Sequence, residues 1–176
     1  VRAAREMEKL ISRLVESDRV RKEHAAAEQK LPRTPDAPRV PGTFELKRGR
    51  LPWPVSEGSI VARFGPQRHP TLRTITQNTG VDIAVRAGSA VTAVAPGDVA
   101  TISWLPSYGN LVILNHQNGF RTVYTHLAEV GVAEGQAVEE GAVIGSSGDT
   151  LDGPRLHFEV WKDREKQNPE QWLMRQ

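Results

Sequence analysis

Cysteine is absent from the 176 residues, and no apolar run approaches the roughly 20 residues that a membrane-spanning helix needs. The missing thiols exclude disulfides and thiolate metal sites, but they do not identify the compartment, because periplasmic chains often lack both. Lysine is absent from residues 49–161, which argues against a lipoyl-carrier barrel, since that fold displays a lysine on a hairpin turn.

Glycine and proline are both absent from residues 1–31, where Ala, Glu, Lys and Arg predominate and favour a helix. This segment carries an apolar stripe at helical spacing, made of Met7, Leu10, Ile11, Leu14 and Val15. The heptad fades beyond the stripe, because Asp18, Arg21 and His24 are poor seam residues. We interpret residues 1–31 as the end of a coiled coil or as a regulatory helix, and we expect the stripe to pack on a neighbouring helix or on the following domain.

Positive charge is concentrated near the N-terminus. Residues 1–50 carry 13 Lys and Arg against 8 Asp and Glu, whereas residues 51–176 carry 10 against 13. The basic residues are mixed with Glu and lack interleaved aromatics, so we expect a solvated helix and no nucleic-acid binding. Because the chain opens on Val1 within the helical pattern, we also expect it to be the C-terminal part of a longer protein.

Four prolines, at positions 32, 35, 38 and 41, predict a semi-rigid polyproline linker over residues 32–50. From residue 51 to residue 176 the sequence changes to short β-branched runs separated by Gly, Pro and Asn. We predict strands at 60–64, 81–85, 90–95, 98–104, 111–116, 121–127, 143–145 and 155–162, and a short helix at 169–173. Such short strands form a mainly β domain, an antiparallel sheet or sandwich with a groove walled by loops.

Successive residues of a strand point to opposite faces, so in three predicted strands the polar side chains lie on the face opposite the apolar ones. In VDIAV the polar residue is Asp82, and in RLHFEV the residues Arg155, His157 and Glu159 share one face. In VYTHL the same spacing pairs Tyr124 with His126. A carboxylate and two imidazoles could therefore meet in one groove, although alternation alone does not establish that they do.

Residues 51–173 resemble the LytM-type (lysostaphin-like) zinc endopeptidases of bacterial cell walls. Six segments carry the resemblance, in the same order and at similar spacing: FGPQRHP, NTGVDIAVRAGSAVTAVAPGDV, YGNLVILNHQNGFRTVYTHL, VEEGAVIGSSGDT, RLHFEVWK and NPEQWL. In the active family, zinc is held by the His and Asp of an H-x-x-x-D motif and by the second His of an H-x-H motif. The first His of H-x-H and a His in a Y-x-H-L segment act on the water and the transition state.

Carried over position by position, the resemblance implies that two of these five residues are replaced. Asp82, His126 and His157 are retained, but Asn78 stands at the first ligand position and Arg155 at the first His of H-x-H. A catalytic zinc needs three protein ligands and an open position for water. Because an amide oxygen is a weak ligand and a guanidinium repels a dication, we expect no zinc, no peptidase activity, and an ion pair or a short water bridge between Asp82 and Arg155.

The order of segments is also similar to that of EnvC-type murein hydrolase activators: a coiled coil, a linker, LKRGRLPWPV and a defective LytM domain. This resemblance implies a periplasmic, non-catalytic activator of an N-acetylmuramoyl-L-alanine amidase in cell separation at the division site. It also implies an upstream coiled coil bound to an inner-membrane ABC-type complex. The amidase would bind the retained groove, lined by Asn78, Asp82, Tyr124, His126, Arg155 and His157.

Two alternatives stay open. One is residual zinc-dependent endopeptidase activity, with His69 or His116 replacing a lost ligand; the more ordinary expectation is that both are hydrogen-bonded loop histidines. The other is a module that binds the glycan or the peptide stems of peptidoglycan. Zinc stoichiometry would identify the first, and peptidoglycan binding without any effect on an amidase would favour the second.

Overall fold

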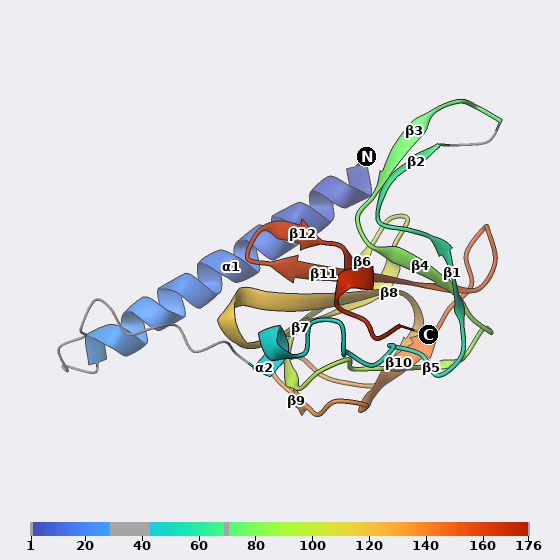
Figure 1. The fold of residues 1–176 in the computed structure, drawn as a ribbon. Coiled ribbons are helices and arrows are strands. Elements are labelled where there is room, and N and C mark those ends of the chain that lie inside the picture. The colour runs from blue at the N-terminus through green and yellow to red at the C-terminus, as the bar shows by residue number, and fades with distance from the viewer. Residues whose placement is uncertain (1, 29–42, 69–70, 176) are drawn as a thin grey trace.

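A computed structural model describes residues 2–28, 43–68 and 71–175 of the chain. It shows one long helix beside an antiparallel β domain (Figure 1), which confirms the predicted mainly β fold. In chain order the elements are α1 (Arg2–Glu28), α2 (Thr43–Leu46), β1 (Ser59–Ala62), β2 (Gly65–Arg68), β3 (Ile75–Asn78), β4 (Val81–Ala84), β5 (Ala90–Thr92), β6 (Gly97–Leu105), β7 (Gly109–Asn115), the turn η1 (Gln117–Gly119), β8 (Phe120–Val130), β9 (Ala137–Val138), β10 (Val143–Ser147), β11 (Arg155–Lys162), β12 (Glu165–Gln167) and the 3-10 helix η2 (Pro169–Gln171).

The main sheet runs in the order β1-β4-β11-β8-β7-β6-β9. Strand β10 pairs with β5 and with the end of β8, β12 pairs with β11, and β2 and β3 form a separate ribbon. All eight predicted strands are present, and η2 lies within the predicted C-terminal helix. The strands that were not predicted, β2, β3, β9 and β12, are two to four residues long, too short for their alternation to stand out.

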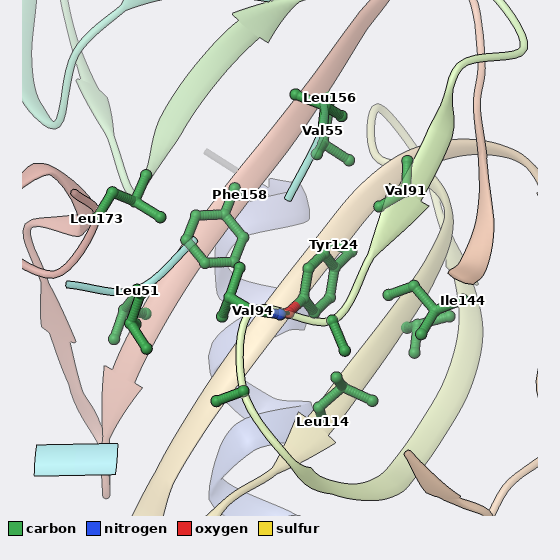
Figure 2. Close-up of a cluster of buried hydrophobic side chains, with 14 of the residues drawn as sticks. Leu51, Val55, Val91, Val94, Leu114, Tyr124, Ile144, Leu156, Phe158 and Leu173 are labelled. Atoms are coloured by element: carbon green, nitrogen blue, oxygen red, sulfur yellow. Dashed lines mark hydrogen bonds between the residues drawn. The ribbon is translucent and has the colours of Figure 1, made fainter. Parts of the chain in front are cut away.

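One face of the main sheet packs into the larger of two hydrophobic clusters, which we call the inner core (Figure 2). Alternate residues of β4 and β11 point into it, as the sequence predicted: Val81, Ile83, Leu156, Phe158 and Val160. Asp82, Arg155 and His157 occupy the alternate positions of the same strands and therefore lie on the opposite face. This alternation is what directs the candidate site residues away from the inner core.

The opposite face carries a second cluster, the outer cluster, which joins the sheet to α1. Met7 and Ile11 of α1 are buried there against Leu105, Leu111, Ile113, Val123 and Trp161. Leu10, Leu14 and Val15 pack at its margin. The predicted packing of the apolar stripe is confirmed, and its partner is the β domain of the same chain.

The polyproline prediction falls mainly on residues 29–42, outside the described residues. The last part of the predicted linker, residues 43–50, packs on the domain: Phe44 is buried in the inner core and stacks on Phe120. Leu51 then forms a parallel bridge with Leu173 near the C-terminus. No helix in the described part of the chain combines the length and the apolarity needed to cross a membrane.

Candidate functional site

The site is organised around two carboxylate–imidazole contacts on the outer face of β4 and β11. Asp82 and His157 lie directly opposite each other in the antiparallel register, which brings their side chains together. His157 donates from Nδ1 to Asp82 Oδ1 at 2.5 Å. Gly80 permits the close approach of the two strands, because a Cβ at that position would lie 2.2 Å from the carbonyl oxygen of Phe158.

The second ring nitrogen of His157 is also engaged by a carboxylate. Nε2 donates to Glu159 Oε1 at 3.0 Å, and Glu159 is fully buried. The same carboxylate accepts hydrogen bonds from Trp161 Nε1, at 2.6 Å, and from Thr79 Oγ1. Burial disfavours charge on the His157 ring, but the hydrogen bonds to Asp82 and Glu159 outweigh it and raise the pKa to about 9. His157 is therefore an imidazolium at neutral pH.

Arg155 approaches Asp82 from the same strand as His157. Its Nη1 lies 3.9 Å from Asp82 Oδ2, so the predicted ion pair is confirmed at the outer limit of such contacts. Its Nη2 donates to the carbonyl oxygen of Asp152 at 2.8 Å, which ties the guanidinium to the loop before β11. Burial would raise the pKa of Asp82, but His157, then Arg155 and His126, lower it below its ordinary value. Asp82 thus carries a negative charge that two cations already offset.

Tyr124 corrects one prediction, because it does not line the groove. Its side chain is fully buried in the inner core beside Phe158 (Figure 2), and its hydroxyl accepts a hydrogen bond from the backbone N–H of Val94 at 3.1 Å. Simple alternation failed because the pairing of β8 with β7 shifts register between Asn110 and Val112. Two residues of β8 lie opposite one of β7 at this bulge, and a sequence pattern does not reveal it.

The bulge is what turns His126 toward the site. His126 has a φ of 61°, in the left-handed region that a non-glycine residue seldom adopts. Its ring lies 6.3 Å from that of His157, and Tyr108 is within 6.2 Å of His126 and 5.5 Å of His157, measured between ring centroids. Burial and then the neighbouring His157 lower the pKa of His126 to about 4, so this ring is neutral when His157 is charged.

Two cavities meet at these side chains, and both are lined by Asp82, Ser107 and His126. The larger, of 820 Å³, continues between the turn before β7 and the 148–155 loop. The smaller, of 540 Å³, is lined by Asn78, Tyr108 and His157, and its other wall is the first turn of α1: Arg2, Ala3, Ala4 and Glu6. We call the two cavities together the groove.

The predicted metal position holds donors that differ from a zinc site. Asn78 uses its Oδ1 to accept from the backbone N–H of Gly80 at 3.4 Å, and its Nδ2 is buried with no acceptor among the described residues. His116 lies elsewhere, with Nδ1 2.7 Å from the carbonyl oxygen of Pro96, so it is a hydrogen-bonded histidine as expected. His69 lies outside the described residues. Within the described ranges, no group of three or more His, Cys, Asp and Glu side chains is arranged to hold a metal ion.

Three residues that the sequence analysis did not assign to the site are Thr79, Tyr108 and Glu159. Glu159 follows the alternation of RLHFEV, so its position on the face of His157 was visible in the sequence, but its burial was not. Tyr108 comes from the turn between β6 and β7, and no local pattern indicates that this turn folds over the site. Burial and the charge of Glu159 raise the pKa of Tyr108 to about 12, which keeps its hydroxyl protonated.

Comparison with known proteins adds independent evidence. A family model described as peptidase family M23 matches residues 76–169. Peptidoglycan DD-endopeptidase ShyA of Vibrio cholerae is 36% identical over 119 residues, which are 65% of this chain and 28% of that protein. Murein hydrolase activator EnvC of Escherichia coli is 34% identical over 137 residues, 76% of this chain and 31% of that protein.

Solved structures agree with the fold. The crystal structure of a zinc-containing peptidase from Vibrio cholerae superposes with a TM-score of 0.63 at 29% identity, covering 70% of this chain and 40% of that one. The chain spans about a third or less of the length of the two curated relatives named above. Their names concern peptidoglycan, or murein, but one is an endopeptidase and the other an activator of hydrolases.

His157 predicts a distinctive dependence of stability on pH. Its pKa rises from 6.5 to about 9 on folding, so its stabilising contribution is complete below about pH 6.5 and is lost as the pH rises through 9. The loss should be on the order of 3 kcal/mol in the free energy of unfolding, measured by urea denaturation between pH 6.5 and 9.5. His157→Gln should flatten this decline, and His24→Gln, at an exposed position on α1, should retain it. Parallel profiles for all three proteins would contradict the assignment.

Proposed function

The chain belongs to peptidase family M23, and we propose that it is a non-catalytic activator of a peptidoglycan amidase rather than a peptidase. The observation that carries the proposal is the charge compensation at Asp82, which His157 contacts at 2.5 Å and Arg155 at 3.9 Å. Similarity to the murein hydrolase activator EnvC over 76% of the chain supports the same conclusion.

The donor set does not fit a catalytic zinc. Both ring nitrogens of His157 donate to carboxylates, so a metal would first have to displace a proton from the ring. The guanidinium of Arg155 lies at the edge of the same carboxylate and would repel a dication. Asn78 can offer only an amide oxygen, a weak ligand beside the imidazole found at that position in active relatives. We therefore propose that no zinc-dependent step takes place here.

The groove remains as a binding surface after the chemistry is gone. Its two cavities, of 820 and 540 Å³, are open and lined by loops and by the protein's own helix, and they are large enough for side chains of a partner segment. We propose that an N-acetylmuramoyl-L-alanine amidase docks there, in the periplasm. The wider assembly, with an upstream coiled coil on an inner-membrane ABC-type complex, belongs to the same proposal.

Helix α1 would limit access to this surface. Its first turn forms one wall of the smaller cavity, and Met7 and Ile11 hold it on the sheet. In proteins most of the stability of a helix comes from packing of its apolar face, and for α1 that contact is the outer cluster. We propose that displacement of α1 widens the groove for the partner.

The first test mixes the purified chain with dye-labelled peptidoglycan, with and without the amidase of the same organism. We expect dye release only when both proteins are present. His126→Ala, at the junction of the two cavities, should reduce the stimulation at least about tenfold, because a central contact of an interface is worth on the order of 2 kcal/mol. Leu46→Ala, at an exposed position on α2 outside the groove lining, is the control and should leave it unchanged. Dye release by the chain alone would overturn the proposal.

The second test concerns α1. Met7→Glu with Ile11→Glu places two carboxylates in the outer cluster and should release the helix, so we expect several-fold stronger stimulation of the amidase than with the unaltered chain. A fragment of residues 44–176 should behave in the same way. Lys9→Glu, on the exposed side of α1, is the matched control. Equal stimulation by all of these proteins would contradict the proposal and would show that α1 does not limit access to the groove.

The alternative is a zinc endopeptidase, which similarity to ShyA favours, and metal binding distinguishes it. The unaltered chain should bind no stoichiometric zinc in titration calorimetry. Asn78→His with Arg155→His should introduce one site, because both changes restore the imidazoles of the active pattern. Adding Asp82→Ala to the repaired chain should abolish that site. Tight zinc binding by the unaltered chain, or no gain after repair, would contradict our account of the site.

A further inference from the structure

Helix α1 meets the sheet through an apolar stripe that does not by itself determine one position. Met7 and Ile11 fill the outer cluster, and Leu10, Leu14 and Val15 lie at its margin. These five residues recur at intervals of three and four, so a slip of one turn would replace each buried side chain by another apolar one. The apolar contacts hold α1 on the sheet, but they leave its position along the axis ambiguous.

The next position of the stripe is acidic. Asp18 follows Met7, Ile11 and Leu14 at the alternating intervals of four and three that a helical seam requires. In a coiled coil a carboxylate at this position would be unfavourable. Here it lies against the sheet, where Arg121 Nη2 donates to Asp18 Oδ2 at 2.5 Å.

Arg121 is a buried cation in the middle of the sheet. It lies on β8 between Trp161 of β11 and Asn115 of β7, and only 1% of its side chain is exposed. Asn115 Nδ2 donates to the same Asp18 oxygen at 3.2 Å. Arg121 Nε and Nη1 have no acceptor in the described part of the chain. Asp163 acts on the guanidinium electrostatically, but the direct anionic contact comes from α1.

We propose that the Asp18–Arg121 pair is a register lock, which selects one position of α1 on the sheet and thereby sets how far its first turn extends along the groove. Ala4, in the groove wall, precedes Asp18 by fourteen residues, or about 21 Å along the helix axis. Because a helix is stiff over this length, a slip of one turn at Asp18 would move the wall by about 5 Å. The lock thus controls the groove from a distance, without touching it.

The other charged contacts of α1 are weaker determinants of position. Lys166 pairs with Glu8, and Arg164 lies 4.0 Å from Glu16, but Glu8, Arg164 and Glu16 are about half exposed and Lys166 is only partly buried. Long exposed side chains follow a helix that moves, and their ion pairs contribute little. A buried guanidinium without its carboxylate is strongly disfavoured, so among the charged contacts of α1 in the described residues the Asp18–Arg121 pair penalises a wrong register most.

The test measures geometry, so it does not depend on the proposed function. Since the chain has no cysteine, Lys9→Cys on α1 and Ser107→Cys on the turn before β7, both exposed, can carry two spin labels at defined positions. Pulsed electron paramagnetic resonance should give one narrow distance for this labelled protein. Adding Asp18→Asn should increase the population outside that distance at least about fivefold, with a component displaced by about 5 Å.

Two further variants make the result decisive. Arg19→Gln removes the neighbouring charge, which pairs with Glu16 and Glu23 of the same helix, and it should keep the single distance. Asp18→Leu with Arg121→Met removes both charges, so α1 should remain protected in hydrogen exchange while the distances spread over several registers. A single unchanged distance in Asp18→Asn, or in the apolar double variant, would show that the stripe alone fixes the helix and would overturn the proposal.

Discussion

The hydrogen-bonded chain from Asp82 through His157 to Glu159 is the interaction on which the site depends. It crosses from β4 to β11 at a directly opposed pair of residues, and Trp161 and Thr79 fix the far carboxylate. One fully buried and one partly buried carboxylate around a single imidazole make a charged ring more favourable than a neutral one, and a metal would have to displace a proton from that ring. The same contacts therefore stabilise the sheet and oppose metal chemistry.

Arg155 acts in the same direction. Its guanidinium lies 3.9 Å from Asp82 and adds a permanent cation beside that carboxylate. An imidazolium and a guanidinium together offset the charge of Asp82, so the strands around that carboxylate need no metal ion for local charge balance. This explains how a groove with the family's architecture is compatible with a role in binding.

The two faces of the sheet have different roles. The inner core is apolar and stabilises the domain, whereas the outer face carries the charged site at one end and the outer cluster with α1 at the other. Because α1 and the site share one face, the position of the helix and the width of the groove are physically coupled. The buried pair of Asp18 and Arg121 gives that coupling a defined geometry.

The sequence by itself determined eight of the strands and the alternation within β4 and β11, because a β-sheet converts a period of two directly into two faces. The resemblance to the LytM-type family, rather than the alternation, predicted the pairing of Asp82 with Arg155. It also determined that the stripe of α1 needs a partner, since apolar side chains at helical spacing require burial. Only the tertiary structure decided which partner: the sheet of the same chain. It also decided the side of Tyr124 and His126, because a bulge between β7 and β8 breaks the alternation through pairing with a distant strand. The tertiary structure likewise decided how far Glu159, Arg121 and Tyr108 are buried. Burial depends on segments that lie far apart in the chain and meet only when it folds.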